Sequence, residues 1–467
     1  MQVVCLFIFS LNAAAAPVPD TGQTKCYNTT AEIPCPSSGQ PFYGQDACYT
    51  INRMSYTKLD EKGGELPDSA ESWSMVKDNN TGLIWEMKTN QDGIENFSDP
   101  HDADNTYIYS ISIYWPDTDG FLKSLNDAGY GGFSDWRLPD LHEINTIIDY
   151  GIPEPGPTIA SKYFTNTVSS NYCSTTAIPY LCSGIRDAYP YRVVNFGSGN
   201  FDQALANYTK IYVRAVRSEK SKNVKKIHPD TLSLIESSGG NRSVTDHSTG
   251  LIWQSDTPSE KMNWEQALSY CENLDLEGYT DWRLPTIKEF RSLVNYENCS
   301  LDPSVFWTST PDSNSLGFAW CAGYSNGLDK TCDMKQTNYV RAVRGGLGKC
   351  KPIIKANGFE NQISITNDSP ISVTVSLEPG DKTGHTADWW FVLDSPWGWY
   401  FQTASEFIQT PEPYYQSTPL FEFHDQQIIA GQLPIGDYTF YFGVYITPNN
   451  STNSPLIIDS VNVHISQ

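Results

Sequence analysis

The sequence predicts an α+β protein in which two tandem repeats precede an all-β region. Two observations support this fold class. Three sequence blocks occur twice in the same order, and the chain after about residue 350 has alternating apolar residues without helical spacing. The 467 residues are enough for about three domains. An aromatic content of 13% argues against a disordered chain.

The repeated blocks define the two copies. Each pair of blocks has the same residues: 81–85 and 249–253 (Thr-Gly-Leu-Ile-Trp), 135–139 and 281–285 (Asp-Trp-Arg-Leu-Pro), 212–217 and 339–344 (Tyr-Val-Arg-Ala-Val-Arg). Trp136 follows Trp85 by 51 positions, whereas Trp282 follows Trp253 by 29. The first copy therefore carries an insertion, around residues 92–113.

Each copy is predicted to contain a strand, two helices, a loop-rich stretch and a final strand. In the second copy, apolar residues at helical spacing from Trp264 predict a helix that Gly278 ends. Thr286 and Glu289 form a capping box for the next helix. The first copy repeats the second helix with Asp140 as N-cap and Glu143 at position N3. Two stretches of the second copy are expected as strands, 251–253 and 339–343.

The Trp and Arg side chains of the blocks are expected to be structural. A large aromatic residue beside Leu-Ile or Leu-Pro normally fills a core, and this applies to Trp85, Trp136, Trp253 and Trp282. Arg137 and Arg283 lie between Trp and Leu-Pro. We expect each to bind carbonyl groups or the acid that caps the helix, rather than a ligand.

The C-terminal region is predicted to be a β-sandwich of immunoglobulin-like type. Apolar residues alternate at 371–375, and further strands are expected at 438–444 and 457–461, between turn-forming residues. Seven aromatic residues lie within 389–401. Trp397 and Trp399 flank a turn and are the best candidates for exposed rings that stack on a sugar or mark an interface, but core or interdomain packing is the favoured interpretation of the cluster.

The first 16 residues have the pattern of a secretory signal. An apolar run leads to four alanines, although no Lys or Arg precedes it, so a truncated start is an open explanation. No later stretch has the ~20 apolar residues of a membrane span. We therefore expect a secreted, periplasmic or cell-surface protein with no integral membrane segment after signal removal.

The cysteines agree with export. Eleven are present and ten follow the signal, an even number that is typical of disulfides in exported proteins. None forms a Cys-x-x-Cys motif, which argues against a zinc ribbon. Cys173 with Cys182 and Cys321 with Cys332 are candidate local pairs, but the spacing leaves the connectivity open.

The net charge restricts the partners. The chain has 54 acidic and 31 basic residues, a formal charge of −23. Such a chain repels phosphate backbones, so nucleic acid is not an expected partner. The same charge opposes binding of highly sulfated or other anionic glycans unless a local basic patch is present.

Both repeats resemble the Lcl C-terminal domain family. The resemblance rests on the three repeated blocks and on Trp307-Thr308-Ser309-Thr310 of the second copy. The first copy departs from the family, because Cys173-Ser174-Thr175-Thr176 stands where Trp-Ser/Thr-Ser-Thr is typical. Residues 283–290 are also similar to a turn in formylglycine-generating enzymes. These resemblances imply a C-type lectin-like fold for each repeat, and binding or adhesion to surface polysaccharides.

The expected function is that of an exported, non-catalytic binding or adhesion protein that recognises an extracellular glycan or protein. Its candidate recognition surfaces are residues 183–200 and 320–330, because loops on a rigid base can vary. The candidate ligand-binding residues are Trp320, Tyr324, Asn326, Asp329, Trp397 and Trp399. Two alternatives stay open, an enzyme distantly related to formylglycine-generating enzymes and a structural envelope component.

The first copy's insertion suggests a calcium site. Asp99, Asp102 and Asp104 lie close to Asn105 in the sequence, and carboxylate and amide oxygens are typical calcium ligands. The spacing is not that of an EF-hand, and the sugar-binding tripeptides of C-type lectins are absent. No other cofactor is expected.

These observations divide the chain into six expected parts: a signal (1–16), an N-terminal extension (17–70), the first repeat (71–217), a lysine-containing linker (218–239), the second repeat (240–345) and the β-sandwich (351–467).

Overall fold

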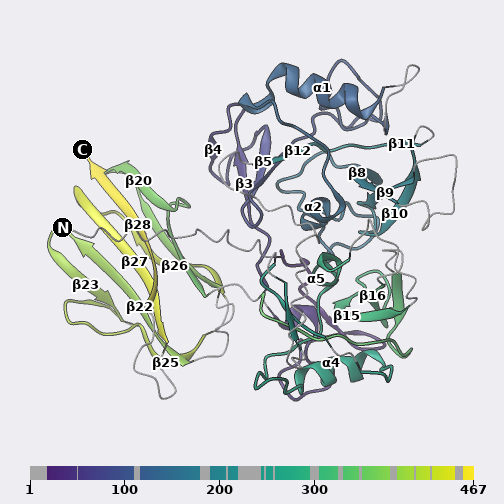
Figure 1. Cartoon of the computed structure of the whole chain (residues 1–467). Helices are drawn as coiled ribbons and strands as arrows, with labels where there is room; N and C mark the ends of the chain where they lie inside the picture. The colour runs from purple at the N-terminus through teal and green to yellow at the C-terminus, as the bar shows by residue number, and fades with distance from the viewer. Residues whose placement is uncertain are drawn as a thin grey trace, which may run out of the picture. The chain divides into compact units, whose positions relative to one another are not determined.

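The computed structural model of the chain is rich in strands and has few helices (Figure 1). It describes residues 18–49, 51–109, 116–178, 190–206, 209–218, 243–246, 249–255, 258–294, 304–323, 330–346, 350–378, 386–403, 406–420, 423–446 and 456–467. The chain divides into two compact units. The first contains both copies of the repeat and ends at Gly346, and the second is formed mainly by Leu347–Gln467.

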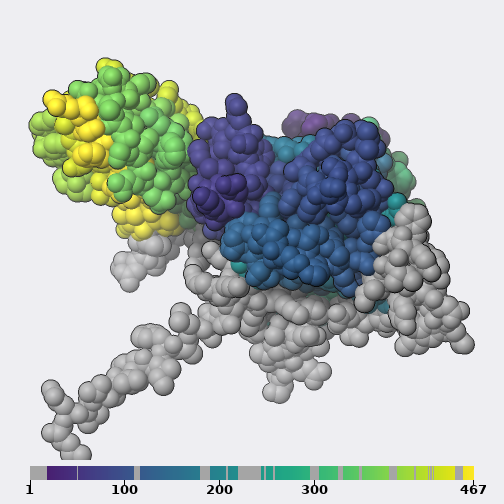
Figure 2. All heavy atoms as spheres, turned by 90° about the horizontal axis from the view of Figure 1, so that it is seen from above, coloured from purple at the N-terminus to yellow at the C-terminus, as the bar shows by residue number. Residues whose placement is uncertain are grey.

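The first copy is built on a five-stranded sheet with the order β12-β6-β5-β3-β4. Its strands are β3 (Tyr56–Leu59), β4 (Glu65–Leu66), β5 (Met75–Asp78), β6 (Leu83–Glu86) and β12 (Val216–Ser218). Trp85 pairs with Val216, so the first and last repeated blocks meet in one ladder. Strands β3 and β4 come from the N-terminal extension, whose purple atoms are continuous with the blue atoms of the first copy in Figure 2.

Two helices and a second sheet complete the first copy. Helix α1 (Thr118–Ala128) begins after Asp117, whose side chain accepts a hydrogen bond from the Gly120 amide at 2.8 Å. Helix α2 (Leu141–Thr146) has the predicted capping box of Asp140 and Glu143. The remaining elements are η2 (Tyr130–Gly132), β7 (Tyr107–Ile108), β11 (Lys210–Ile211) and the antiparallel sheet of β8 (Asn171–Ala177), β9 (Pro190–Asn195) and β10 (Phe201–Leu205).

The second copy repeats this design in a shorter form. Trp253 pairs with Val343, as Trp85 pairs with Val216 in the first copy. The capping box of Thr286 and Glu289 is formed as predicted. The elements are β13 (Ser243–Thr245), β14 (Ile252–Gln254), α4 (Trp264–Glu272), α5 (Ile287–Ser292), β15 (Val305–Pro311), β16 (Phe318–Gly323), β17 (Lys330–Asp333) and β18 (Val343–Arg344).

Two predicted boundaries in the second copy are wrong. Helix α4 ends at Glu272, because Asn273 caps it well before Gly278. The strand expected at 339–343 is reduced to β18. The Tyr339 amide donates to the Val305 carbonyl of one sheet, whereas the Ala342 carbonyl accepts from the Gln254 amide of another. The segment therefore crosses between two sheets and cannot extend one ladder.

The motif side chains are structural, as predicted. Trp85, Trp136, Trp253 and Trp282 are buried. Arg137 and Arg283 each bind both oxygens of the glutamate in the following capping box, at 2.5 and 2.6 Å. The Asp-Trp-Arg-Leu-Pro block therefore connects the turn to the helix through a bidentate ion pair.

The N-terminal segment packs on the second copy. It contains β1 (Cys26–Tyr27), β2 (Glu32–Ile33) and η1 (Asp46–Cys48), with a disulfide between Cys26 and Cys35. Tyr27 joins the core around Trp264. The Thr310 hydroxyl donates to Asp46 Oδ2 at 2.5 Å.

The C-terminal unit is two-layered and all-β in its described part. A three-stranded sheet has the order β19-β21-β26, and a seven-stranded sheet has the order β20-β28-β27-β22-β23-β24, with β25 beside β22. One hydrophobic core contains residues of both sheets, including Val373 and Phe440. The strands are β19 (Lys351–Ala356), β20 (Asn361–Thr366), β21 (Ile371–Glu378), β22 (Thr386–Ser395), β23 (Gly398–Gln402), β24 (Phe407–Ile408), β25 (Tyr415–Pro419), β26 (Phe423–Gly431), β27 (Gly436–Ile446) and β28 (Leu456–Ser466).

Within the part of the chain that the structure describes, every helix is too short or too polar to cross a bilayer.

Candidate functional site

The two copies form one body because their second helices pack together. Arg291 of α5 is fully buried and donates to Asn145 Oδ1 of α2 at 3.1 Å and to the Gly199 carbonyl at 3.4 Å. Lys288 of α5 donates to the Thr146 carbonyl at 3.0 Å. One hydrophobic core includes apolar residues from both copies, such as Ile144 and Phe290. The helices α2 and α5 lie side by side in Figure 1.

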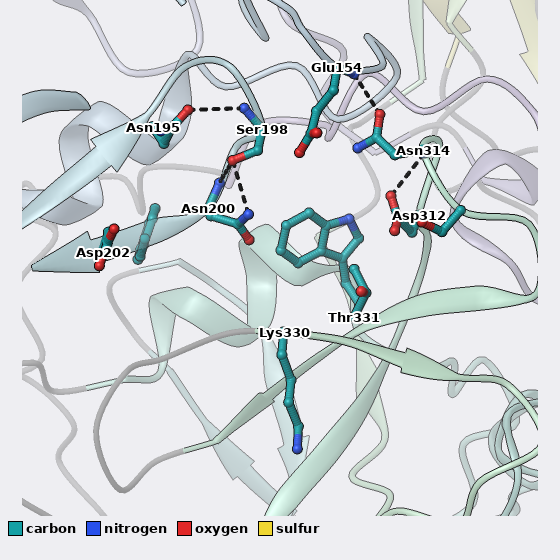
Figure 3. A pocket seen from close by; sticks show the side chains of 12 residues that line it. Glu154, Asn195, Ser198, Asn200, Asp202, Asp312, Asn314, Lys330 and Thr331 are labelled. Atoms are coloured by element: carbon teal, nitrogen blue, oxygen red, sulfur yellow. Dashed lines mark hydrogen bonds between the residues drawn. The ribbon is translucent and has the colours of Figure 1, made fainter. Parts of the chain in front are cut away.

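A pocket of about 530 Å³ lies where the two copies meet. The first copy contributes the turn between β9 and β10 and the loop at Glu154, and the second contributes the loop between β15 and β16 and the start of β17 (Figure 3). Its lining residues are Glu154, Asn195, Ser198, Asn200, Phe201, Asp202, Asp312, Asn314, Ser315, Trp320, Lys330 and Thr331. The pocket therefore depends on both copies.

Aromatic rings support the pocket from inside the protein. Trp320, in β16, is 3% exposed and contacts Tyr150 edge to face at 5.3 Å. The Arg291 guanidinium lies 3.7 Å from the centre of the Phe201 ring and 5.6 Å from that of Trp320. The same buried arginine that joins the copies therefore also fixes the two aromatic lining residues.

The wall from the first copy is a hydrogen-bonded turn. Asn195 Oδ1 accepts from the Ser198 amide at 3.2 Å. Ser198 Oγ accepts from both the amide and the side chain of Asn200, at 3.3 and 2.9 Å. The turn holds three polar side chains against the pocket without using all of their hydrogen-bonding groups (Figure 3).

The wall from the second copy reaches across to the first. Asp312 Oδ1 accepts from the Asn314 amide at 2.9 Å. Asn314 Oδ1 accepts from the Glu154 amide at 2.5 Å, which ties the loops of the two copies together. The amide and hydroxyl groups of the Asn, Ser and Thr residues that line the pocket can donate and accept hydrogen bonds with a polyhydroxylated ligand.

The pocket is acidic. Glu154, Asp202 and Asp312 line it, and Lys330 is the only basic lining residue among those that the structure describes. The Lys330 side chain extends away from the other labelled residues in Figure 3. Burial raises the pKa of the Asp312 carboxyl, hydrogen bonds from Asn314 and Ser315 oppose that rise, and the nearby Glu154 charge adds to it.

The predicted ligand-binding residues lie in different parts of the chain and do not form one site among the described residues. Trp320 lies in the pocket. Tyr324, Asn326 and Asp329 fall outside the described residues. Trp397 and Trp399 belong to the C-terminal unit. They are 57% and 50% exposed, so the favoured expectation of core packing is wrong for these two rings.

The predicted calcium site is not formed. Asp99 accepts from the Thr89 hydroxyl at 2.7 Å, Asp102 from the Asp104 amide at 2.9 Å, and Asp104 from the Gly93 amide at 2.7 Å. Each carboxylate stabilises its own part of the loop. Among the described residues, no three His, Cys, Asp or Glu side chains come together as a metal site.

One of the two predicted disulfides is present. Cys321 and Cys332 are bonded and join β16 to β17. Cys173, in contrast, has a free and fully buried thiol in the first copy's core, so the predicted pair with Cys182 is not formed. Cys182 lies outside the described residues. The pairing of Cys26 with Cys35 was not predicted.

Both repeats match one known protein family. The Lcl C-terminal domain matches residues 74–217 and 242–344, more than half of the chain. The chain belongs to the Lcl C-terminal domain family. Both matched segments are Lcl C-terminal domains, and together they form the pocket. No curated protein matches the chain.

Sequence reasoning found part of the pocket of the paired Lcl domains. Asn195, Ser198 and Asn200 lie at the end of the predicted surface 183–200, and Trp320 and Lys330 are the ends of the predicted surface 320–330. Glu154, Asp202 and the loop 312–315 were missed. The run Asp-Ser-Asn-Ser after Trp307–Pro311 was the available signal, because such residues favour exposed, hydrogen-bonding loops.

Proposed function

We propose that the chain is an exported, non-catalytic binding protein whose paired Lcl domains recognise a glycan in the pocket between them. The polar pocket carries this proposal. Six of its lining residues are Asn, Ser or Thr, which can exchange hydrogen bonds with sugar hydroxyl groups. The rings of Phe201 and Trp320, which are 4% and 3% exposed, form a rigid support behind these polar groups.

We also propose a fold type for each domain and an exported location for the chain. Each Lcl domain is a C-type lectin-like module, supported by its two helices and by a loop-rich segment that forms a second small sheet. The C-terminal unit is an immunoglobulin-like sandwich, supported by its two sheets around one core. Export is supported by the signal pattern and the disulfides.

The test is a glycan array with the full chain, followed by titration calorimetry with the glycans that bind. Thr331→Trp fills the pocket from an edge strand, and Asn200→Ala removes a donor and an acceptor. Each is expected to weaken binding at least about tenfold, as truncation or blocking of a central contact does.

Leu316→Trp is the matched control for the bulky substitution. Leu316 is 59% exposed on the same loop as Asn314 but does not line the pocket. Its affinity for the glycan should equal that of the parent chain. Glycan binding that survives Thr331→Trp and Asn200→Ala would remove the pocket from the proposal.

A further inference from the structure

We infer that the pocket selects glycans that carry free amino groups, that is, hexosamines without an N-acetyl group. This inference rests on the proposed function and specifies its ligand class. The described lining of the pocket has an excess of negative charge. Among the residues with a described placement, three carboxylates line the pocket, and the one basic lining residue, Lys330, directs its side chain away from them.

The carboxylates come from both copies and surround the space. Glu154 and Asp202 belong to the first copy and Asp312 to the second. Within the part of the chain that the structure describes, no ion pair neutralises these three side chains, whereas other acids of the repeats, such as Glu143 and Glu289, are paired with arginine. Unpaired acids facing one cavity attract a cation, and low-dielectric walls strengthen that attraction.

A metal ion does not explain this arrangement. Among the described residues, no three acidic, His or Cys side chains come together closely enough to hold one. Dispersed carboxylates instead suit a larger cationic ligand that contacts them separately. A hexosamine has the required chemistry, since its ammonium group would face the acids while its hydroxyl groups meet Asn200, Asn314 and Thr331.

The charge also gives selectivity against other sugars. A uronic acid or sulfated sugar would bring a like charge into an acidic pocket of a chain whose net charge is −23. N-acetylation removes the ammonium charge and leaves the hydroxyl groups. Such a sugar would keep the hydrogen bonds and lose the ionic contribution.

The experiment compares three oligosaccharides of equal length: a glucosamine oligomer, its N-acetylated form and a uronic acid oligomer. Calorimetry of the full chain at mildly acidic pH, where the amino groups of the oligomer are protonated, should give a dissociation constant at least about tenfold lower for the glucosamine oligomer than for the N-acetylated form. Added sodium chloride should reduce this difference, because exposed charges are screened.

Charge-neutralising variants test the assignment. Glu154→Gln and Asp202→Asn change exposed side chains and keep the hydrogen bond that the Glu154 backbone amide donates to Asn314 Oδ1. Together they should lower the affinity for the glucosamine oligomer to that for the N-acetylated form, which abolishes the preference for the free amine. Asp275→Asn, at an exposed acid outside the pocket, should keep the preference.

The outcomes separate the two proposals. Equal affinity for both hexosamine oligomers, insensitive to Glu154→Gln and Asp202→Asn, would overturn the amine selectivity and leave glycan recognition standing. Binding of other neutral glycans alone, blocked by Thr331→Trp, would do the same. If oligolysine binds in a Glu154- and Asp202-dependent manner and no glycan does, the ligand is a basic peptide and both proposals fail.

Discussion

In the first Lcl domain Cys173 occupies the strand position that Trp307 occupies in the second, and both side chains are fully buried. The neighbouring strand compensates. Tyr191 of the first domain corresponds to Ala319 of the second, since each pairs with the residue four positions after the exchanged one. A small and a large residue have therefore changed places between adjacent strands, which preserves the filled volume.

The two domains also differ at a buried polar position, which is Glu86 in the first and Gln254 in the second. Glu86 of the first domain accepts hydrogen bonds from Lys88 and His101, each at 2.9 Å, and from the Ala215 amide. Gln254, at the corresponding place, accepts from the Ala342 amide at 3.1 Å and donates to Tyr270. The backbone contact is common to both domains, while the side-chain partners have diverged. The family motifs thus fix turns and caps, and the cores vary by compensation.

The largest expected change in stability comes from removing the arginine of the Arg–Glu pair, and it should differ between the two domains. The side chains of Arg283 and Glu289 are 2% and 1% exposed, whereas that of Arg137 is 43% exposed. Arg283→Ala leaves a buried carboxylate without its partner and should reduce the free energy of unfolding by about 3–5 kcal/mol. Arg137→Ala should cost about 1 kcal/mol or less, because water replaces the partner. Urea denaturation of both variants measures this, and equal losses would contradict the difference in burial.

The N-terminal segment provides a pH-dependent contrast. Asp46 binds Thr310 of the second domain, and burial raises the pKa of its carboxyl to about 7. Because this folded-state value exceeds the unfolded one, the contribution of Asp46 to stability is full below about pH 4 and is lost as the pH rises to about 7. The loss is on the order of 4 kcal/mol at most, from the size of the pKa shift.

Asp46→Asn isolates this contribution. The asparagine cannot ionise, so the free energy of unfolding of the variant relative to the parent should increase between about pH 4 and about pH 7. Thermal denaturation across that range measures the difference, with Asp275→Asn as an exposed control. A parallel pH dependence in the parent and Asp46→Asn would show that this carboxyl does not titrate in the range.

The exchange between Cys173 and Tyr191 can be reversed in steps. Cys173→Trp overfills the first domain's core and should reduce the free energy of unfolding by about 1–3 kcal/mol. Adding Tyr191→Ala opens the space that Ala319 leaves in the second domain, so the double variant should be more stable than the sum of the single effects predicts. A double-mutant cycle measures this coupling, and strictly additive losses would show that the two positions do not share volume.

The smallest effect should be equal in both domains. Gly82 and Gly250 hold the same turn before the Trp strand with φ values of 74° and 76°. Gly82→Ala and Gly250→Ala each place a side chain in the left-handed region and should cost about 1 kcal/mol. Denaturation curves of the two variants should give the same loss within error. A clear difference between them would mean that the turns are not equivalent.

The sequence by itself determined the features that depend on near neighbours. The two copies, their capping boxes, the buried Trp residues and the Arg–Glu pairs follow from residues within a few positions of one another. So do the long strands of the C-terminal unit. Local hydrogen bonds and side-chain periodicity encode such features directly.

Only the tertiary structure decided the pocket and the fate of the polar clusters. Glu154 and Asn314 are 160 residues apart, and they meet because Arg291 and the shared core join α2 to α5. Asp99, Asp102 and Asp104 are close in sequence, yet each accepts a hydrogen bond from a different group of the surrounding loop. Cys173 is buried away from any disulfide for the same reason. Distances between residues far apart in the chain, and the directions of side chains within a loop, follow from packing, which no local pattern specifies.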